Sequence, residues 1–301
     1  MSELAQVREA AVMDRSGAPA LSDLLELAKP RVTSLVVATS AFGFYLGSRG
    51  AVDPLLLVHT LLGTTLIASG TSAYNMYLER DSDGKMERTR RRPLPDGRLQ
   101  PVHALAFATA LLVTGILYLA LAVNLLTSLL AIATLASYIF LYTPMKRWSP
   151  LCTLVGAVPG ALPPLGGWAA ATGSLSAGGW ALFAILFLWQ LPHSLAIAWM
   201  YRDDYERGGF RVLPVVDPEG GSTVRQIVGN ALALIPVSLT PVLLGVAGVW
   251  YFYGAILMGF ILVAYCLRMA RTRTRVHARS IVLASVLYLP VLLFLMALDR
   301  L

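Results

Sequence analysis

Nine long apolar stretches of about 20 residues each constrain this chain more than any other feature, because that length and composition let an α-helix cross a bilayer. The chain is 56% hydrophobic and only 14% charged, against about 25% charged residues in soluble domains. A soluble enzyme, a disordered protein and an ordinary nucleic-acid-binding domain are therefore excluded. The predicted spans are 32–49, 55–77, 102–122, 124–143, 150–171, 179–201, 227–248, 249–270 and 278–298.

The distribution of basic residues tests this count. Of the 24 Lys and Arg residues, 22 lie before the first predicted span, in the connections that follow spans two, four, six and eight, or within three residues of those connections. Only Arg49 and Arg300 lie on the other side. Lys and Arg collect on the cytoplasmic side of membrane proteins. The pattern therefore predicts one all-α transmembrane domain over 1–301, with its N-terminus in the cytoplasm and its C-terminus outside.

The first 31 residues do not show the order typical of a signal peptide, which is a basic start, an apolar core and a cleavage site of small residues. They also contain five acidic residues, which transit peptides avoid. We therefore expect 1–25 to be a cytoplasmic tail and the chain to be a multi-pass protein of a bacterial cytoplasmic (inner) membrane. The two cysteines, Cys152 and Cys266, lie far apart in apolar stretches, and we expect them to be buried, inert thiols.

The two longest connections, 78–101 and 202–226, hold most of the acids, and both are predicted to be cytoplasmic. In the first, Asn75, Glu79 and Asp83 are spaced four residues apart, so they share one face of a helix that continues from the second span. Oxygen ligands of this kind suit Mg²⁺, which shares its coordination with substrate phosphates. A cluster of arginines follows at once, and guanidinium groups fit phosphate oxygens well. The alternative interpretation is a solvated loop whose arginines only fix topology.

The second connection repeats the pattern on the same side of the membrane. Asp203 and Asp204 follow the sixth span, with Arg207 and Arg211 close behind. The two connections together predict a pair of acidic segments that bracket one diphosphate through Mg²⁺. The alternative for Asp203 and Arg207 is an ordinary surface pair on a helix.

Polar residues inside the apolar spans are the remaining candidates, because intramembrane ionisable groups usually serve a function. Gln190 and His193 lie in the sixth span. His193 either ligates iron or handles a proton, or is a satisfied packing residue. Lys146 either reaches the diphosphate or is a topology charge at a span end. Pro159, with the prolines that follow it, predicts a kinked fifth helix that faces the bundle rather than lipid.

These segments together resemble the UbiA superfamily of intramembrane prenyltransferases, and in particular its heme O synthase branch. The resemblance covers nearly the whole chain and is carried by the following stretches: LAKPR at 27–31, NMYLERDSDGKMERTRRRPLP at 75–95, YTPMKR at 142–147, GAVPGALPPLGGWAA at 156–170, WQLPHSLAIA at 189–198 and DDYERGGFRVLPVV at 203–216. It implies nine helices around a central cavity that opens to the cytoplasmic side, and Mg²⁺-dependent loss of diphosphate from an allylic donor.

Carried over residue by residue, the resemblance makes Asn75, Glu79 and Asp83 the first metal site. In the second segment Tyr201 and Tyr205 align with acids of many relatives, which leaves Asp203 and Asp204 as the available metal ligands and puts that site in doubt. The predicted diphosphate-binding residues are Lys85, Arg88, Arg92, Lys146, Arg207 and Arg211. The residues predicted to line the cavity for heme and the prenyl chain are Tyr74, Trp189, Gln190, His193, Tyr201 and Tyr205.

The implied reaction joins the farnesyl group of farnesyl diphosphate to a vinyl group of heme b, with water supplying a hydroxyl, and yields heme O for heme–copper oxidase maturation. Heme b is then a substrate, and Mg²⁺ is the cofactor. Apart from the lipid bilayer, the resemblance names heme A synthase or an oxidase assembly factor as a candidate partner, and no nucleic acid. The alternatives are prenylation of an aromatic quinone precursor such as 4-hydroxybenzoate and, more distantly, a polytopic transporter. A transporter should instead show acids near mid-span.

Overall fold

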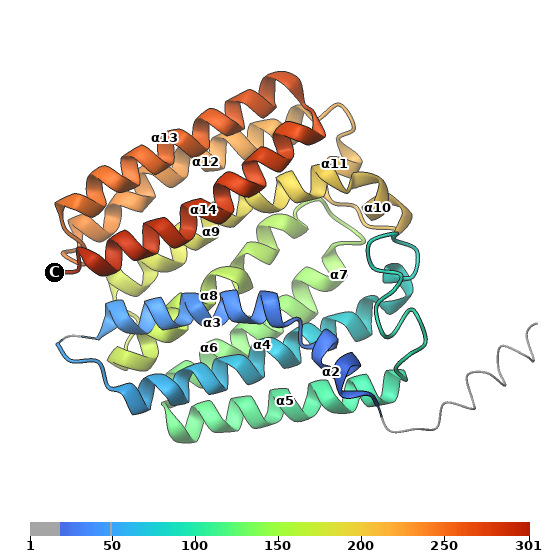
Figure 1. The fold of residues 1–301 in the computed structure, drawn as a ribbon, viewed down its shortest axis with the longest axis horizontal. Helices are drawn as coiled ribbons and strands as arrows, with labels where there is room; N and C mark the ends of the chain where they lie inside the picture. The colour runs from blue at the N-terminus through green and yellow to red at the C-terminus, as the bar shows by residue number, and fades with distance from the viewer. Residues whose placement is uncertain (1–18, 49) are drawn as a thin grey trace, which may run out of the picture.

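The computed structural model describes residues 19–48 and 50–301, and every named element in these ranges is a helix (Figure 1). Part of the predicted tail, 1–18, and Arg49 lie outside the described residues. The long helical stretches are α3 (Pro30–Gly47), α4 (Pro54–Asp83), α5 (Pro101–Ala122), the continuous run of α6 (Leu125–Ala136), η1 (Ser137–Tyr142) and α7 (Thr143–Met145), α8 (Cys152–Thr172), α9 (Ala177–Met200), α12 (Gly221–Leu243), α13 (Val249–Thr272) and α14 (Arg275–Leu298). Shorter helices are α2 (Leu21–Leu27), α10 (Arg202–Arg207) and α11 (Leu213–Val216).

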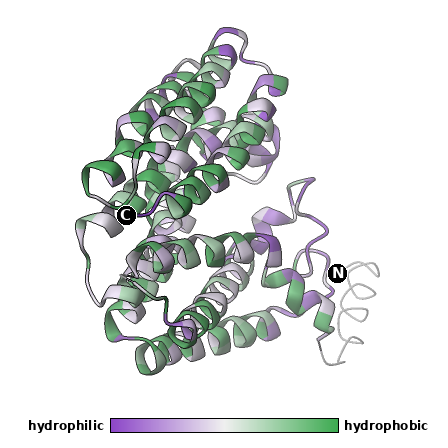
Figure 2. Cartoon of the chain, turned by 60° about the vertical axis from the view of Figure 1, so that its left-hand side comes forward, coloured by the Kyte–Doolittle hydropathy of each residue, from purple (hydrophilic) through white to green (hydrophobic). Residues whose placement is uncertain are grey.

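The all-α membrane fold is confirmed, and a long helical stretch stands at each of the nine predicted positions within the described chain. Seven of these stretches are long and apolar enough to cross a membrane. The other two, α3 and α8, are less apolar because α3 carries an arginine and several hydroxyl residues and α8 is rich in Gly and Pro. Nine spans therefore remains a prediction. Figure 2 shows the long helices as mostly hydrophobic ribbon, with hydrophilic segments gathered mainly in some of the connections.

Two helices extend beyond their predicted spans. The helix of the second span, α4, continues to Asp83, so Asn75, Glu79 and Asp83 stand on one face of it, as their spacing predicted. The seventh helix, α12, begins at Gly221 rather than at 227, because the carboxylate of Asp217 accepts hydrogen bonds from the backbone N–H and the hydroxyl of Thr223. Helix α2 begins at Leu21, inside the predicted cytoplasmic tail 1–25.

The long helices form two groups. The first consists of α3, α4, α5, α6 and α8, and the second consists of α9, α12, α13 and α14; α8 and α9 pack together and join the groups (Figure 1). The short helices α2, α10 and α11 and the connection 84–100 lie at one end of the molecule, and the C-terminus lies at the other (Figure 1). The two acidic connections are thus brought to the same end, as their predicted common side of the membrane requires.

Close packing of α3 against α8 depends on glycine. A Cβ atom on Gly167 would lie 1.9 Å from the main-chain oxygen of Ser40, and one on Gly43 would lie 2.0 Å from that of Pro164. Small residues let membrane helices approach until their backbones touch. Pro159 and Pro164 are buried inside α8, which confirms that this helix faces the bundle. Both cysteines are free and buried.

Large apolar side chains cover the outer faces of the second group. Trp250 and Leu257 of α13 are 75% and 62% exposed, and Leu283 and Leu287 of α14 are each 62% exposed. Soluble proteins rarely expose large apolar side chains along whole helix faces in this way. Together with the lengths of the helices, this exposed apolar surface identifies a multi-pass membrane protein.

Candidate active site

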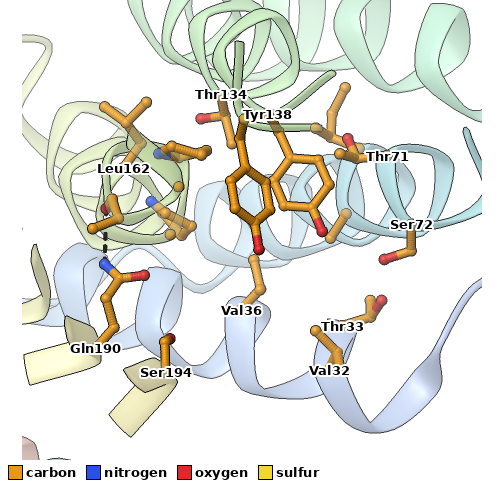
Figure 3. A pocket seen from close by; sticks show the side chains of 18 of the residues that line it. Val32, Thr33, Val36, Thr71, Ser72, Thr134, Tyr138, Leu162, Gln190 and Ser194 are labelled. Atoms are coloured by element: carbon orange, nitrogen blue, oxygen red, sulfur yellow. Dashed lines mark hydrogen bonds between the residues drawn. The ribbon is translucent and has the colours of Figure 1, made fainter. Parts of the chain in front are cut away.

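A cavity of about 470 Å³ lies within the first group of helices and is closed on one side by α9. Its lining comes from α3, α4, α5, α6, η1, α8, α9 and α10, and within the described chain α12, α13 and α14 contribute no lining residue. Most of the wall is apolar or carries hydroxyl groups, such as those of Thr33, Thr71 and Ser194 (Figure 3). The charged lining residues, Arg88 and Lys146, come from the end where the two acidic connections meet. The cavity therefore has a charged end and a long, largely uncharged body.

The π-helical segment η1 shapes one wall of this cavity. Segments with this wider helical turn occur most often at functional sites. Here η1 brings Tyr138 and Tyr142 into the lining, with ring centroids 5.1 Å apart, and Figure 3 shows the Tyr138 ring projecting into the cavity. A Cβ atom on Gly156 would lie 2.5 Å from the Tyr142 ring, so this glycine makes room for the ring.

The charged end is built on the last two turns of α4. Asn75, Glu79 and Asp83 are 2%, 6% and 1% exposed, and they share one face as the spacing predicted. Asp81 lies on the opposite face, and its side chain is 77% exposed. The helix ends at Asp83 with Gly84 as its C-cap. Three buried oxygen-bearing side chains thus share one face of α4 beside the charged end of the cavity, although none of them is in the lining itself.

A cation contacts each of these three side chains. The ammonium of Lys146 lies 2.7 Å from a carboxylate oxygen of Glu79, and Arg92 donates to Asp83 over 2.7 Å. Lys29 donates to the Oδ1 atom of Asn75 over 3.4 Å. The amide nitrogen of Asn75 donates to the hydroxyl of Thr143, directly after η1. Two predicted diphosphate ligands, Lys146 and Arg92, are therefore held at the predicted metal face.

The two lysines respond differently to their surroundings. Burial and the neighbouring Arg92 charge lower the pKa of Lys29 to about 8. Burial also works to lower the pKa of Lys146, but the Glu79 carboxylate outweighs it and holds that pKa well above its usual value. Lys146 thus stays an ammonium ion under physiological conditions.

One oxygen of this cluster has no partner. Oδ2 of Asp83 is paired with Arg92, whereas Oδ1 is buried and accepts no hydrogen bond within the described structure. A buried carboxylate oxygen without a partner is costly, and such groups mark places where an ion is expected. Among the described residues no three His, Cys, Asp or Glu side chains converge on one point. A cation here would therefore be held by the two carboxylates, the Asn75 amide oxygen and groups of a ligand.

The second acidic segment meets the first but presents its carboxylates differently. Asp204 is buried and accepts the backbone N–H of Glu87 over 3.1 Å and a bond from Arg207. Burial works to raise the pKa of Asp204, but these hydrogen bonds outweigh it and keep that pKa below its usual value. Asp203 is exposed and bonds Arg275 over 2.5 Å, which lowers the pKa of Asp203. The alternative interpretation, a surface pair of Asp203 with Arg207, is wrong, because Arg207 pairs with Asp204 and Asp203 pairs with Arg275.

Some of the predicted cavity residues on α9 and α10 face the cavity, and others face away from it. Gln190 and Tyr205 line the cavity; the Gln190 amide donates to the main-chain oxygen of Ala157 over 2.8 Å (Figure 3). Trp189 and His193 lie on the other face, where the Trp189 indole donates to the main-chain oxygen of Ser285 and His193 lies 2.8 Å from the Ser285 hydroxyl. Neither residue lines this cavity, and both contact α14 instead.

The remaining predicted residues lie around the mouth or away from it. Tyr74 packs against α5 and is not in the lining of this cavity. Lys85 and the Arg211 side chain are exposed, and the Arg211 backbone donates to the main-chain oxygen of Lys146. Tyr201 is 38% exposed and lies beside Arg88.

Sequence reasoning missed four residues of this site: Lys29, Tyr138, Tyr142 and Thr143. Lys29 enters the sequence prediction only as one of the 22 basic residues on one side, although the Pro that follows it places it at the start of a helix and thus at the charged end. No sequence signal marks the π-helical turn that aims the two tyrosines.

Comparison with known proteins identifies the family of this chain. The model of the UbiA prenyltransferase family matches residues 36–297. The chain belongs to the UbiA prenyltransferase family. Among curated relatives of this family member, the protoheme IX farnesyltransferase of Solibacter usitatus is 52% identical over 93% of this chain and 99% of its own length. The protoheme IX farnesyltransferase of Salinibacter ruber is 46% identical, again over 93% of this chain and 99% of its own length.

Solved structures show that this family member has the UbiA fold. A structure described as digeranylgeranylglyceryl phosphate synthase superposes with a TM-score of 0.78 at 15% identity and covers 93% of this chain and 98% of its own. A UbiA homolog from Archaeoglobus fulgidus bound to GPP and Mg²⁺ gives a TM-score of 0.64 at 16% identity, over 91% of this chain and 99% of its own. At these identities the likeness concerns the fold alone.

Proposed function

We propose that this chain transfers the farnesyl group of farnesyl diphosphate to a vinyl group of heme b and produces heme O and diphosphate. The observation that carries the choice of acceptor is the 52% identity, over 93% of the chain, to a protein named protoheme IX farnesyltransferase. The cavity supports the class of reaction independently, because it joins a cluster of cations and carboxylates to a long apolar body. A diphosphate ester of an apolar chain fits this cavity, because its diphosphate matches the charged end and its chain matches the apolar body.

Mg²⁺ fits the charged end, because Asp83 offers an unpartnered buried oxygen there and Glu79 and Asn75 offer two more oxygen ligands on the same face of α4. These three residues would hold the ion. Bound there with the diphosphate, Mg²⁺ neutralises the negative charge that develops on the leaving group. A structure with GPP and Mg²⁺ in an Archaeoglobus fulgidus homolog of the same fold accords with this assignment.

The cations of the site act on the same leaving group. Lys146, Arg92 and Lys29 are already fixed by Glu79, Asp83 and Asn75, so they need little reorganisation when the diphosphate departs. Preorganised charges of this kind are the largest source of catalysis in many enzymes. We propose that these residues, together with Arg88, bind the diphosphate.

The body of the cavity protects the reactive carbon. Loss of diphosphate leaves an allylic cation, and the vinyl carbon of heme b attacks it; a water oxygen then adds to the adjacent carbon, and its proton leaves to solvent. The ring of Tyr142 already receives a cation, since the Lys146 ammonium lies 4.4 Å from its centroid. Aromatic faces stabilise positive charge. Tyr142 and the adjacent Tyr138 are therefore placed to stabilise the allylic cation.

The membrane arrangement belongs to the same proposal. The chain forms one domain over 1–301 with nine spans in a bacterial cytoplasmic membrane. The charged mouth and the N-terminus face the cytoplasm, because 22 of the 24 basic residues cluster on that side. The C-terminus faces outward. Heme A synthase or an oxidase assembly factor is the expected recipient of the product.

A direct assay tests the function. Purified protein receives farnesyl diphosphate, Mg²⁺ and heme b, and the porphyrins are identified by mass spectrometry; a parallel reaction contains 4-hydroxybenzoate instead of heme b. We expect a porphyrin that has gained one farnesyl group and one water, and no prenylated hydroxybenzoate. A prenylated hydroxybenzoate without any farnesylated porphyrin would refute the proposal. If the protein turns over no prenyl diphosphate, that result would favour the transporter alternative.

A further inference from the structure

Gln190 holds its amide group in one fixed orientation at the wall of the cavity. The amide nitrogen donates to the main-chain oxygen of Ala157 over 2.8 Å and to that of Leu186 over 3.0 Å. Carbonyl oxygens only accept hydrogen bonds, so the nitrogen must face them and the amide oxygen, Oε1, must point the other way. Figure 3 shows the nitrogen at the bond to α8 and the oxygen on the opposite side of the amide.

The Oε1 atom of Gln190 has room but no partner. Within the described chain it accepts no hydrogen bond, and it is not among the fully enclosed polar atoms there. A Cβ atom on Gly160 would lie 2.1 Å from Oε1, so the absence of a side chain at this glycine makes room for the oxygen. Both residues line the cavity. The amide therefore presents a free acceptor to the cavity, while its N–H donors are already used.

The depth of this oxygen in the cavity can be read along α8. Gly156 makes room for the Tyr142 ring, which lies beside the Lys146 ammonium at the charged end. Gly160 follows four residues later, and four residues of an α-helix rise about 6 Å. Oε1 of Gln190 thus lies about one turn deeper than the ring that is proposed to stabilise the allylic cation. In the proposed reaction a second positive charge arises next to the new carbon–carbon bond, which is at this depth rather than at the diphosphate.

A second polar group faces the same space. Ser194 follows Gln190 by four residues on α9, so the two side chains are neighbours on one face, with about 5–6 Å between their Cβ atoms. Both line the cavity (Figure 3), and the Ser194 hydroxyl has no hydrogen-bond partner within the described residues either. An enclosed water needs about two to four polar partners. The amide oxygen and the hydroxyl are spaced to share one water.

We propose that Gln190, together with Ser194, holds the water that becomes the hydroxyl group of the product. Attack of the vinyl group on the farnesyl carbon forms the carbon–carbon bond and leaves a positive charge on the vinyl carbon next to the porphyrin. The water donates a hydrogen bond to Oε1, and a lone pair of its oxygen forms the carbon–oxygen bond to that positive carbon. One proton of the water then passes by way of the Ser194 hydroxyl, one turn nearer the charged end, to solvent. An amide oxygen is too weak a base to take this proton, so Gln190 orients the water.

This inference rests on the proposed function, because the water reacts only after the farnesyl group has joined heme b. The alternative is that Gln190 serves only to join α9 to α8 through its amide nitrogen. The product distinguishes the two roles. Without a water in place, the cation loses a proton from the neighbouring CH₂ carbon, and the product is an alkene that is lighter by one water.

The experiment measures the ratio of unhydrated to hydrated farnesylated porphyrin by mass spectrometry, with purified protein, farnesyl diphosphate, Mg²⁺ and heme b. Gln190→Met keeps the length of the side chain but removes Oε1, and it should raise this ratio about 3- to 10-fold, the factor that one hydrogen bond contributes. Gly160→Ala places a Cβ atom 2.1 Å from Oε1 and should raise the ratio by a similar factor. Ser194→Ala should raise it by less, because Oε1 still holds the water.

Two matched controls lie on α12, away from the cavity. Gln226→Met changes an exposed glutamine, and Gly229→Ala adds a Cβ atom that meets no atom within 4 Å. Both controls should give the product ratio of the unchanged protein. Thermal unfolding of every variant identifies any that fails to fold.

The outcomes separate this inference from the proposed function. An unchanged product ratio in Gln190→Met and Gly160→Ala would overturn the inference and leave the proposed function standing. Loss of all farnesyl transfer in folded variants would overturn it too, because the water acts only after the carbon–carbon bond has formed. If both variants fail to fold, Ser194→Ala decides, and an unchanged ratio in that variant would overturn the inference. A whole protein that makes no farnesylated porphyrin would refute the proposed function and this inference with it.

Discussion

Replacement of Asp83 by Ala should separate catalysis from stability. The side chain of Asp83 is 1% exposed, and it makes two opposing contributions to the folded protein. Oδ2 pairs with Arg92 over 2.7 Å, and a hydrogen bond to a charged group contributes about 1.5–3 kcal/mol. Oδ1 is buried without a partner, and such an atom costs about 1–3 kcal/mol. Because the two contributions are of similar size, the free energy of unfolding should change by less than about 1 kcal/mol.

Activity should respond much more strongly than stability. We propose that Asp83 holds Mg²⁺ at the departing diphosphate, and the loss of one preorganised group at such a centre costs about 100- to 1000-fold in rate. Arg92 is 23% exposed at its side chain, so it can turn into water when its partner is removed rather than remain as a buried charge.

The assay pairs two measurements on the same detergent-purified protein. Thermal unfolding is followed without ligands, and formation of farnesylated heme is followed by mass spectrometry. Asp81→Ala is the matched control, since Asp81 lies two positions away on the exposed face of α4 with a 77% exposed side chain. A large loss of thermal stability in Asp83→Ala, or activity that survives the substitution, would refute the reasoning about its unpartnered oxygen.

Three further substitutions test the packing and charge of the fold. Lys146→Met leaves Glu79 buried without a partner and should destabilise the protein by about 3–5 kcal/mol in thermal unfolding, with much less loss for Lys146→Arg. Gly167→Ala places a Cβ atom 1.9 Å from a main-chain oxygen of α3 and should destabilise by about 1–3 kcal/mol or more, whereas Gly166→Ala meets no atom within 4 Å and should be nearly neutral. Arg98→Ala removes ion pairs to three carboxylates, two of them on α2, and should make α2 sensitive to limited proteolysis while leaving the remaining helices protected.

The helices could be predicted from sequence because each one reflects a single local property. A run of about 20 apolar residues has few alternatives to a helix in a bilayer. The shared face of Asn75, Glu79 and Asp83 could be predicted as well, because it depends only on helical periodicity. Boundaries were less certain where a distant side chain decides them, as Asp217 does for the start of α12.

The parts of the site that depend on packing could not be predicted. Trp189 and Gln190 are neighbours in sequence, yet the first bonds α14 and the second lines the cavity. In an apolar helix of a membrane protein, hydrophobic periodicity does not say which face meets lipid, cavity or another helix, since all three are apolar. The π-helical turn before Thr143 and the reach of Lys29 to Asn75 likewise arise from contacts between elements.

The central claim is that this site transfers a farnesyl group to heme b. The most direct measurement offers the purified protein both heme b and 4-hydroxybenzoate in one reaction with Mg²⁺ and isotopically labelled farnesyl diphosphate, and determines which acceptor carries the label. The account predicts label in a porphyrin that has also gained one water. Label in prenylated hydroxybenzoate, with none in the porphyrin fraction, would contradict it.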